Sequence, residues 1–165
     1  MGIEIERRFL ISREDWRNLV VDKQLLRQGY LAITSDGLTV RFRISGQGKA
    51  WLTVKSPAEG IARHEFEYLI PVSDAEALWE LTPHRLIKTR YELNIGPADW
   101  VVDCFEGENA SLSIAEVELC NAEEIVQIPE WCGKEVTGEF QLSNAALART
   151  PLACWPSDRR RDLGV

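Results

Sequence analysis

Apolar and polar residues alternate along eight segments of the chain, and this period of two predicts β-strands. The predicted strands cover residues 3–10, 24–34, 38–45, 50–56, 61–71, 86–95, 99–105 and 112–120. Turn-forming pairs such as Asp36-Gly37 and Gly96-Pro97 separate several of them. Because the connections are short, we expect neighbouring strands to run antiparallel. Eight such strands favour a closed barrel, since closure removes the exposed sheet edges.

The helical signals are fewer and shorter than the strand signals. A helix over residues 13–20 would follow Ser12 as its N-cap, and a helix over residues 74–81 would follow Ser73 in a capping-box pattern. After residue 120 we expect short helical pieces, including residues 144–149. The predicted fold class is α+β and mainly β, with helices packed outside an eight-stranded antiparallel barrel. At this length, residues 1–165 are predicted to form a single domain.

Paired charges recur on one face of these strands, and apolar residues occupy the other face. The pairs are Glu4 and Glu6 with Arg8, Arg41 with Arg43, Glu65 with Glu67, Lys88 with Arg90, and Glu116 with Glu118. A single charged face is most simply explained by contact with water. Recurrence on most of the strands instead favours a barrel that closes with its charges inside, although the alternation itself fits closure in either direction.

A charged interior of mixed sign suits a polyanion bound together with metal ions. Arginine forms bidentate hydrogen bonds with phosphate oxygens, and paired carboxylates suit hard cations such as Mg²⁺ or Mn²⁺. The opposite charges, with a bound phosphate chain and metal, would compensate one another, as buried charge requires. The sequence contains no phosphate-binding P-loop, nucleophile elbow or H-E-x-x-H motif that indicates a competing chemistry.

Overall composition narrows the functional classes. The net charge of −7 weighs against nucleic acid as the main partner. No apolar run approaches the roughly 20 residues of a membrane-spanning helix, so we expect no membrane association. The four cysteines form no C-x-x-C pair, which predicts reduced thiols, no zinc site and a cytoplasmic location.

The ordered series of charged motifs resembles the CYTH superfamily, also called the triphosphate tunnel metalloenzymes. Its signature E-x-E-x-K strand corresponds to residues 4–8, and the resemblance continues through the later charged strands over nearly the whole chain. Arg8 stands where the family usually has lysine. Because arginine does not deprotonate in proteins, the resemblance implies that Arg8 clamps charge and does not donate a proton.

The resemblance implies an eight-stranded tunnel that processes triphosphates with a divalent metal. Small bacterial members are similar to inorganic triphosphatases, which hydrolyse tripolyphosphate to diphosphate and phosphate. The alternatives are a class IV-type adenylyl cyclase, a thiamine or nucleoside triphosphatase, and a non-catalytic polyphosphate-binding module. A homodimer is possible by the same analogy.

The resemblance also assigns roles to individual residues. The expected triphosphate ligands are Arg8, Arg41, Arg43, Lys55, Lys88 and Arg90. The expected metal ligands are Glu4, Glu6, Glu65, Glu67, Asp103, Glu116 and Glu118. The catalytic set is expected to be Glu4, Glu6, Glu67 and Asp103, with the general base unassigned. Supporting or solvent-facing roles are expected for Arg63, Glu92 and Glu106, and residues 143–149 are expected to plug one tunnel mouth.

Overall fold

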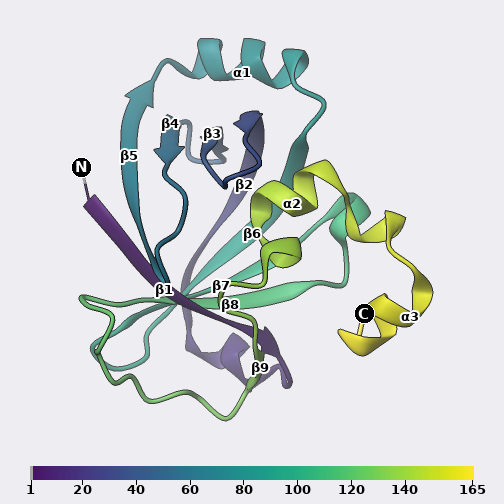
Figure 1. Cartoon of the computed structure of the whole chain (residues 1–165). Helices are drawn as coiled ribbons and strands as arrows, with labels where there is room; N and C mark the ends of the chain where they lie inside the picture. The colour runs from purple at the N-terminus through teal and green to yellow at the C-terminus, as the bar shows by residue number, and fades with distance from the viewer. Residues whose placement is uncertain (1) are drawn as a thin grey trace.

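The chain folds into a closed antiparallel β-barrel with short helices around it (Figure 1). The computed structural model describes residues 2–165. Its barrel strands are β1 (Gly2–Ile11), β2 (Val20–Ile33), β3 (Thr39–Ser45), β4 (Ala50–Lys55), β5 (Ala62–Ile70), β6 (Arg85–Leu93), β7 (Asp99–Phe105) and β8 (Ser113–Glu118). The α-helices are α1 (Val72–Leu81), α2 (Asn144–Arg149) and α3 (Ser157–Asp162). Single 3₁₀ turns lie at Asp15–Leu19, Gly107–Asn109, Phe140–Leu142 and Leu152–Cys154.

The first strand closes the barrel. The sheet order is β5-β4-β3-β2-β6-β7-β8-β1, and β1 also pairs with β5. Residues 2–5 of β1 pair with β5, whereas residues 6–10 pair with β8. The predicted eight-stranded antiparallel barrel is therefore confirmed. A short ninth strand, β9 (Cys132–Glu135), pairs with the end of β1 and was not predicted, because four residues carry no recognisable alternation.

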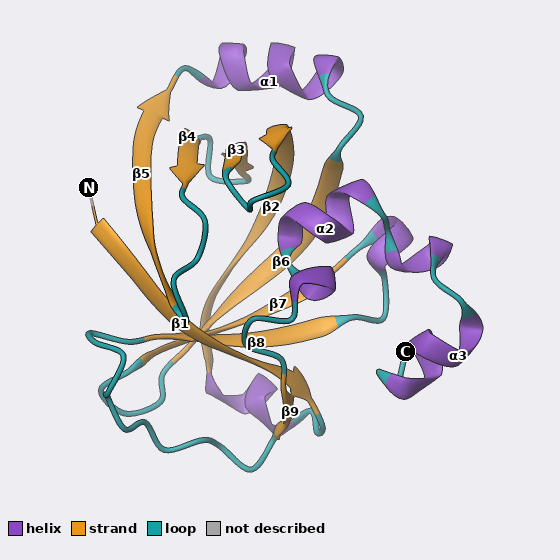
Figure 2. Cartoon of the chain, in the orientation of Figure 1, coloured by secondary structure: helices purple, strands orange, loops and turns teal. Residues whose placement is uncertain are grey.

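Apolar clusters cover much of the outside of the barrel, so the charged face closes inward. Helix α1 packs against β3 and β4, where Ala75 joins a buried cluster with Phe42 and Ile44 (Figure 2). A second outer cluster contains Trp16 and Trp100 on the β1–β7–β8 side. Burying this apolar area is the main stabilising contribution to such a fold.

One end of the barrel interior is apolar, which corrects the expectation of a continuously charged inner face. Leu10, Leu86 and Ile114 point inward there and pack with Leu147 of α2. Helix α2, which lies within the residues 143–149 expected to plug one tunnel mouth, therefore fills this end of the barrel, whereas α1 packs on the outside. The reason is local: the inward positions of the strands change from charged to apolar residues near this end, and an apolar end needs an apolar cover.

Both predicted N-caps are wrong. Ser12 Oγ donates to the carbonyl oxygen of Trp131 at 3.0 Å, and the following turn is 3₁₀ and begins at Asp15. Helix α1 begins at Val72 after Pro71, with no side-chain cap, so Ser73 already lies inside the helix. In the first case a partner distant in sequence takes the hydroxyl group, and in the second Pro71 sets the start of the helix.

Two other features bear on the sequence predictions. No helix within residues 2–165 is long and apolar enough to cross a membrane. None of the four cysteines forms a disulfide bond in the structure.

Candidate active site

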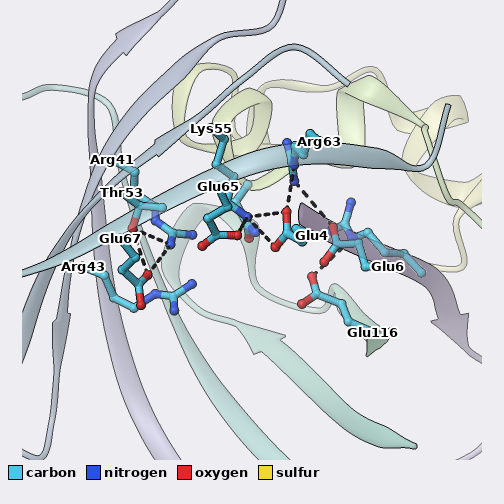
Figure 3. Close-up of polar contacts among 12 residues, drawn as sticks. Glu4, Glu6, Arg41, Arg43, Thr53, Lys55, Arg63, Glu65, Glu67 and Glu116 are labelled. Carbon is cyan, nitrogen blue, oxygen red and sulfur yellow. Dashed lines mark hydrogen bonds and ion pairs between the residues drawn. The ribbon is translucent and has the colours of Figure 1, made fainter. Parts of the chain in front are cut away.

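A cavity of about 420 Å³ opens into the charged part of the barrel interior. Side chains of both signs reach it from β1 and from β3 to β8, and Asn144 reaches it from α2. Its charged lining residues are Glu4, Glu6, Arg41, Arg43, Lys55, Arg63, Glu65, Glu67, Arg90, Asp99, Glu116 and Glu118. Figure 3 labels ten of the residues in this region, with Arg41 and Arg43 on one side and Glu6 and Glu116 on the other.

The cationic side of the cavity is formed by strand β3. Arg41 Nη2 donates to Thr53 Oγ1 at 3.0 Å and lies 3.5 Å from Glu67 Oε2. Arg43 Nε donates to Gln28 Oε1 at 3.0 Å, and no described carboxylate lies within 4.0 Å of the Arg43 guanidinium. Burial, with Arg41 and Arg90 nearby, lowers the pKa of Arg43 to about 9. This side of the cavity therefore carries excess positive charge, which an anion would compensate.

Glu4 lies at the centre of an ion-pair network. Its two carboxylate oxygens accept from Lys55 Nζ at 2.6 and 2.7 Å, and Arg63 Nε donates to Oε2 at 2.8 Å. Lys55 Nζ also lies 3.1 Å from Glu65 Oε2. Burial by itself raises the pKa of Glu4, but Lys55 and Arg63 outweigh that effect and hold it well below its usual range. Glu4 is therefore a carboxylate at neutral pH.

The acidic side of the cavity is formed by β1 and β8. Glu6 is the register partner of Glu118, and its only ion pair among the described residues is a contact of 3.6 Å with Arg63. Burial, followed by repulsion from Glu116 and Glu4, raises the pKa of Glu6 to about 7. Negative charge on this side is thus incompletely compensated, and a cation would relieve the repulsion.

An ion-pair network that is centred on the fully buried Asp103 and Lys88 extends from behind the cavity to its lining. Asp103 accepts from Arg90 Nε at 2.8 Å and from Arg90 Nη2 at 2.7 Å, and it also accepts from Lys88 Nζ. Burial raises the pKa of Asp103, but Arg90 and Lys88 outweigh this and hold it well below its usual range. Arg90 Nη2 reaches on to Glu116 Oε2 at 2.6 Å. Asp103 thereby fixes the orientation in which Arg90 enters the cavity.

Arg8 also lies behind the cavity. Its Nε donates to Glu116 Oε1 at 3.2 Å, and its Nη2 donates to the carbonyl oxygen of Leu142 at 3.1 Å. Arg8 thus connects β1 to β8 and to the segment that leads into α2. A cation in this place orients Glu116 and lies out of reach of the main cavity.

Most of the predicted site residues converge on the cavity. Those in its lining are Glu4, Glu6, Glu65, Glu67, Glu116, Glu118, Arg41, Arg43, Lys55 and Arg90. Arg8, Lys88 and Asp103 are buried outside that lining. Arg63 lines the cavity and pairs with Glu4, although the sequence indicated only a supporting role. Asn144 was missed, because nothing in its local sequence marks a residue that α2 brings in from a distance.

The carboxylates of the cavity suit a hard divalent cation for which the protein supplies only some of the ligands. The acidic side chains offer carboxylate oxygens, which Mg²⁺ and Mn²⁺ prefer. Within residues 2–165, however, no three Asp, Glu, His or Cys side chains are grouped closely enough to hold an ion by themselves. Such a site suits Mg²⁺, which commonly takes one or two carboxylates together with water and phosphate oxygens.

Known structures with the same fold include a close counterpart. A crystal structure of an inorganic triphosphatase aligns with a TM-score of 0.65 at 34% identity, over 90% of this chain and 95% of that chain. A protein from Pyrococcus horikoshii aligns with a TM-score of 0.58 at 17% identity, over 73% of this chain and 80% of that chain, and shows the fold alone.

Sequence relatives agree with this comparison. An inorganic triphosphatase from Acetivibrio thermocellus is 39% identical over 92% of this chain and 96% of the relative. An inorganic triphosphatase from Nitrosomonas europaea is 36% identical over 88% of this chain and 96% of the relative. Residues 2–150 match the CYTH domain. With its closed barrel and its cavity of opposed charges, the chain belongs to the CYTH family.

Proposed function

We propose that the protein is a metal-dependent inorganic triphosphatase that hydrolyses tripolyphosphate to diphosphate and phosphate. The observation that carries the proposal is a single cavity with an arginine side on β3 and a carboxylate side on β1 and β8. A phosphate chain with its divalent cation matches that division of charge. The inorganic triphosphatases at 36–39% identity support the same activity.

The cations would hold the phosphate chain. Arg41 and Arg43 approach it from β3, while Lys55 and Arg90 approach it from β4 and β6. Positioning and charge stabilisation supply most of the catalysis in phosphoryl transfer, so rigid cations have a large effect. Asp103, which is paired with Lys88, contributes by fixing Arg90, and Arg8 contributes by fixing Glu116.

The carboxylates would hold the metal. The proposed ligands are Glu4, Glu6, Glu116 and Glu118, with water and phosphate oxygens completing the shell. A bound divalent cation supplies charge neutralisation at the phosphate oxygens and orientation of the attacking water. Glu65 and Glu67 lie on the adjacent strand at the edge of the cavity. We assign proton acceptance from water to Glu67, because a cation pairs more loosely with Glu67 (3.5 Å) than with Glu4 (2.6 Å) or Glu65 (3.1 Å).

The test is phosphate release from tripolyphosphate, ATP and thiamine triphosphate, each with Mg²⁺, with Mn²⁺ and with chelator. The expected result is metal-dependent release that is fastest from tripolyphosphate. Preference for an organic triphosphate, or formation of cyclic nucleotide and diphosphate from ATP, would replace the proposal with another activity. Binding without turnover of any substrate would leave a polyphosphate-binding protein.

A further inference from the structure

The cations of the barrel interior differ in how they are neutralised. Arg8, Lys88 and Arg90 each lie within 4.0 Å of at least one carboxylate, and so do Arg41, Lys55 and Arg63. Arg43 alone among these interior cations has no carboxylate within that distance in residues 2–165. Its side chain nevertheless lines the cavity, where water supplies less solvation than at the surface. Something other than an ion pair must therefore hold Arg43 in place.

That partner is the amide of Gln28. Gln28 lies on β2 directly opposite Arg43 in the sheet register, and its side chain is fully buried. Its Oε1 accepts the Nε–H of Arg43 at 3.0 Å. A bond at Nε fixes the plane of the guanidinium and leaves the two Nη groups to other acceptors. No described residue accepts a hydrogen bond from the Nη groups of Arg43.

Further donors beside Arg43 are also unsatisfied. The side-chain Nε2 of Gln28 and the Nε of Arg41 are both buried and lack a hydrogen-bond partner in the described chain. Buried donors without acceptors reduce stability, so they are uncommon in native proteins. Acceptors are therefore scarce around Arg43, and Arg41 and Arg43 line the cavity, where a ligand could supply them, whereas Gln28 does not. Phosphate oxygens supply several acceptors together with negative charge.

We propose that Gln28 is a positioning residue of the triphosphate site, a neutral acceptor that orients Arg43 and leaves its charge for a phosphate group. This inference rests on the proposed function. A carboxylate in the same place would hold Arg43 equally well and would neutralise it, as Glu4 does for Lys55. The bound phosphate would then have to compete with an internal anion. A neutral amide avoids that competition at this position.

Three variants test the proposal. Gln28→Glu places a carboxylate at Arg43 Nε, Gln28→Met removes the acceptor without adding charge, and Gln47→Glu adds the same charge in the exposed turn between β3 and β4 as a matched control. The readouts are kcat and KM for tripolyphosphate with Mg²⁺, and tripolyphosphate binding measured by calorimetry in chelator. Thermal denaturation without ligand shows whether each variant folds.

The expected result is that Gln28→Glu weakens tripolyphosphate binding and raises KM by about tenfold or more, while its thermal midpoint is unchanged or higher. Gln28→Met is expected to weaken binding as well, but with a lower midpoint because Arg43 Nε loses its acceptor. Gln47→Glu should match the wild type. If Gln28 had only a structural role, its substitution would change the thermal midpoint, and a variant that still folds would keep the wild-type KM.

Two outcomes separate the failure of this inference from the failure of the proposed function. Wild-type protein that neither binds nor hydrolyses tripolyphosphate overturns the proposed function. Active wild-type protein, with Gln28→Glu retaining affinity and KM within about twofold, overturns the role of Gln28 alone. If Gln28→Glu does not fold, Gln28→Met decides: wild-type affinity in that variant overturns the proposal, and weakened affinity supports it.

Discussion

Replacing Asp103 with asparagine is expected to destabilise the protein strongly even when no metal is present. The substitution keeps the shape of the side chain and removes its charge. Asp103 and Lys88 are fully buried, and the Arg90 side chain is only 19% exposed. Without the carboxylate, two buried cations share a neutral amide, and Glu116 remains the only carboxylate that pairs with either of them in residues 2–165. The protein then contains buried charge with too little compensation.

The expected magnitude follows from this geometry. Removing one partner of a buried ion pair typically costs about 3–5 kcal/mol, and Asp103 serves two cations in a region without solvent screening. For a chain of this size, each kcal/mol lowers the melting temperature by about 2–4 °C. We therefore expect Asp103→Asn to lower it by roughly 6–20 °C.

The pH dependence provides a second measure. Because the folded-state pKa of Asp103 is lowered, its contribution is present above the unfolded pKa and is lost as pH falls through the folded value. The stability difference between wild type and Asp103→Asn should therefore shrink below about pH 4. Burial lowers the pKa of the partner Lys88 to about 8, so the comparison is made between about pH 3 and 6, where Lys88 keeps its charge in the wild type.

The assay is thermal denaturation in chelator, with Glu106→Gln as the control. Glu106 follows β7 on the surface, and among described side chains it accepts a hydrogen bond only from Thr89 Oγ1. Glu106→Gln should therefore change the free energy of unfolding by no more than about 0.5 kcal/mol. A metal ligand would behave differently from an ion-pair anchor. If Asp103→Asn melts within 2 °C of the wild type in chelator but binds Mg²⁺ more weakly, Asp103 is a ligand and the reasoning above is refuted.

Three further predictions concern other parts of the molecule. Glu4→Gln should lower kcat/KM for tripolyphosphate by about 10²-fold or more, since Glu4 is both a proposed metal ligand and the partner of Lys55, and phosphate release near the wild-type rate would contradict this. Gly29→Ala should cost about 1–3 kcal/mol in urea denaturation, because a Cβ there would lie 2.5 Å from Phe42 Cε1, and an unchanged midpoint would disprove the clash. Arg7→Ala should cost less than about 1 kcal/mol despite two hydrogen bonds of 2.9 Å to Glu135, because the pair is solvent-exposed, and a larger loss in the same assay would show that it is coupled to its surroundings.

The period-two pattern predicted which side chains share a face of the sheet, because strand geometry alone decides that, and the recurrence of paired charges favoured the charged face as the interior. The pattern did not predict how far along the barrel interior each inward side chain lies. Arg8 has the same alternation as Glu4, yet only Glu4 reaches the main cavity. Depth depends on the tilt and stagger of the strands in the closed barrel, which involve all eight strands at once.

The sequence also did not predict features that depend on contacts with other strands or segments. Gln28 lies within the predicted strand 24–34 with nothing to distinguish it, and its role appears only when Arg43 lies opposite it. Ser12 matched a helix cap locally, but Trp131 takes its hydroxyl group. In each case the deciding contact joins residues far apart in sequence, and local patterns contain no information about it.

The position of β1 in the barrel has a consequence for folding kinetics. Strands β2 to β8 pair largely with neighbours in sequence, whereas Arg8 meets Glu116 across 108 residues. Contacts of such high sequence separation form slowly, because a long loop must be ordered before they form. We therefore expect docking of β1 to be the late step of folding. Because Glu4 and Glu6 arrive with that strand, the acidic side of the cavity forms only when the barrel closes. A partly folded chain with β1 undocked would lack both the closed sheet and half of the active site, so activity should recover only with the last folding phase.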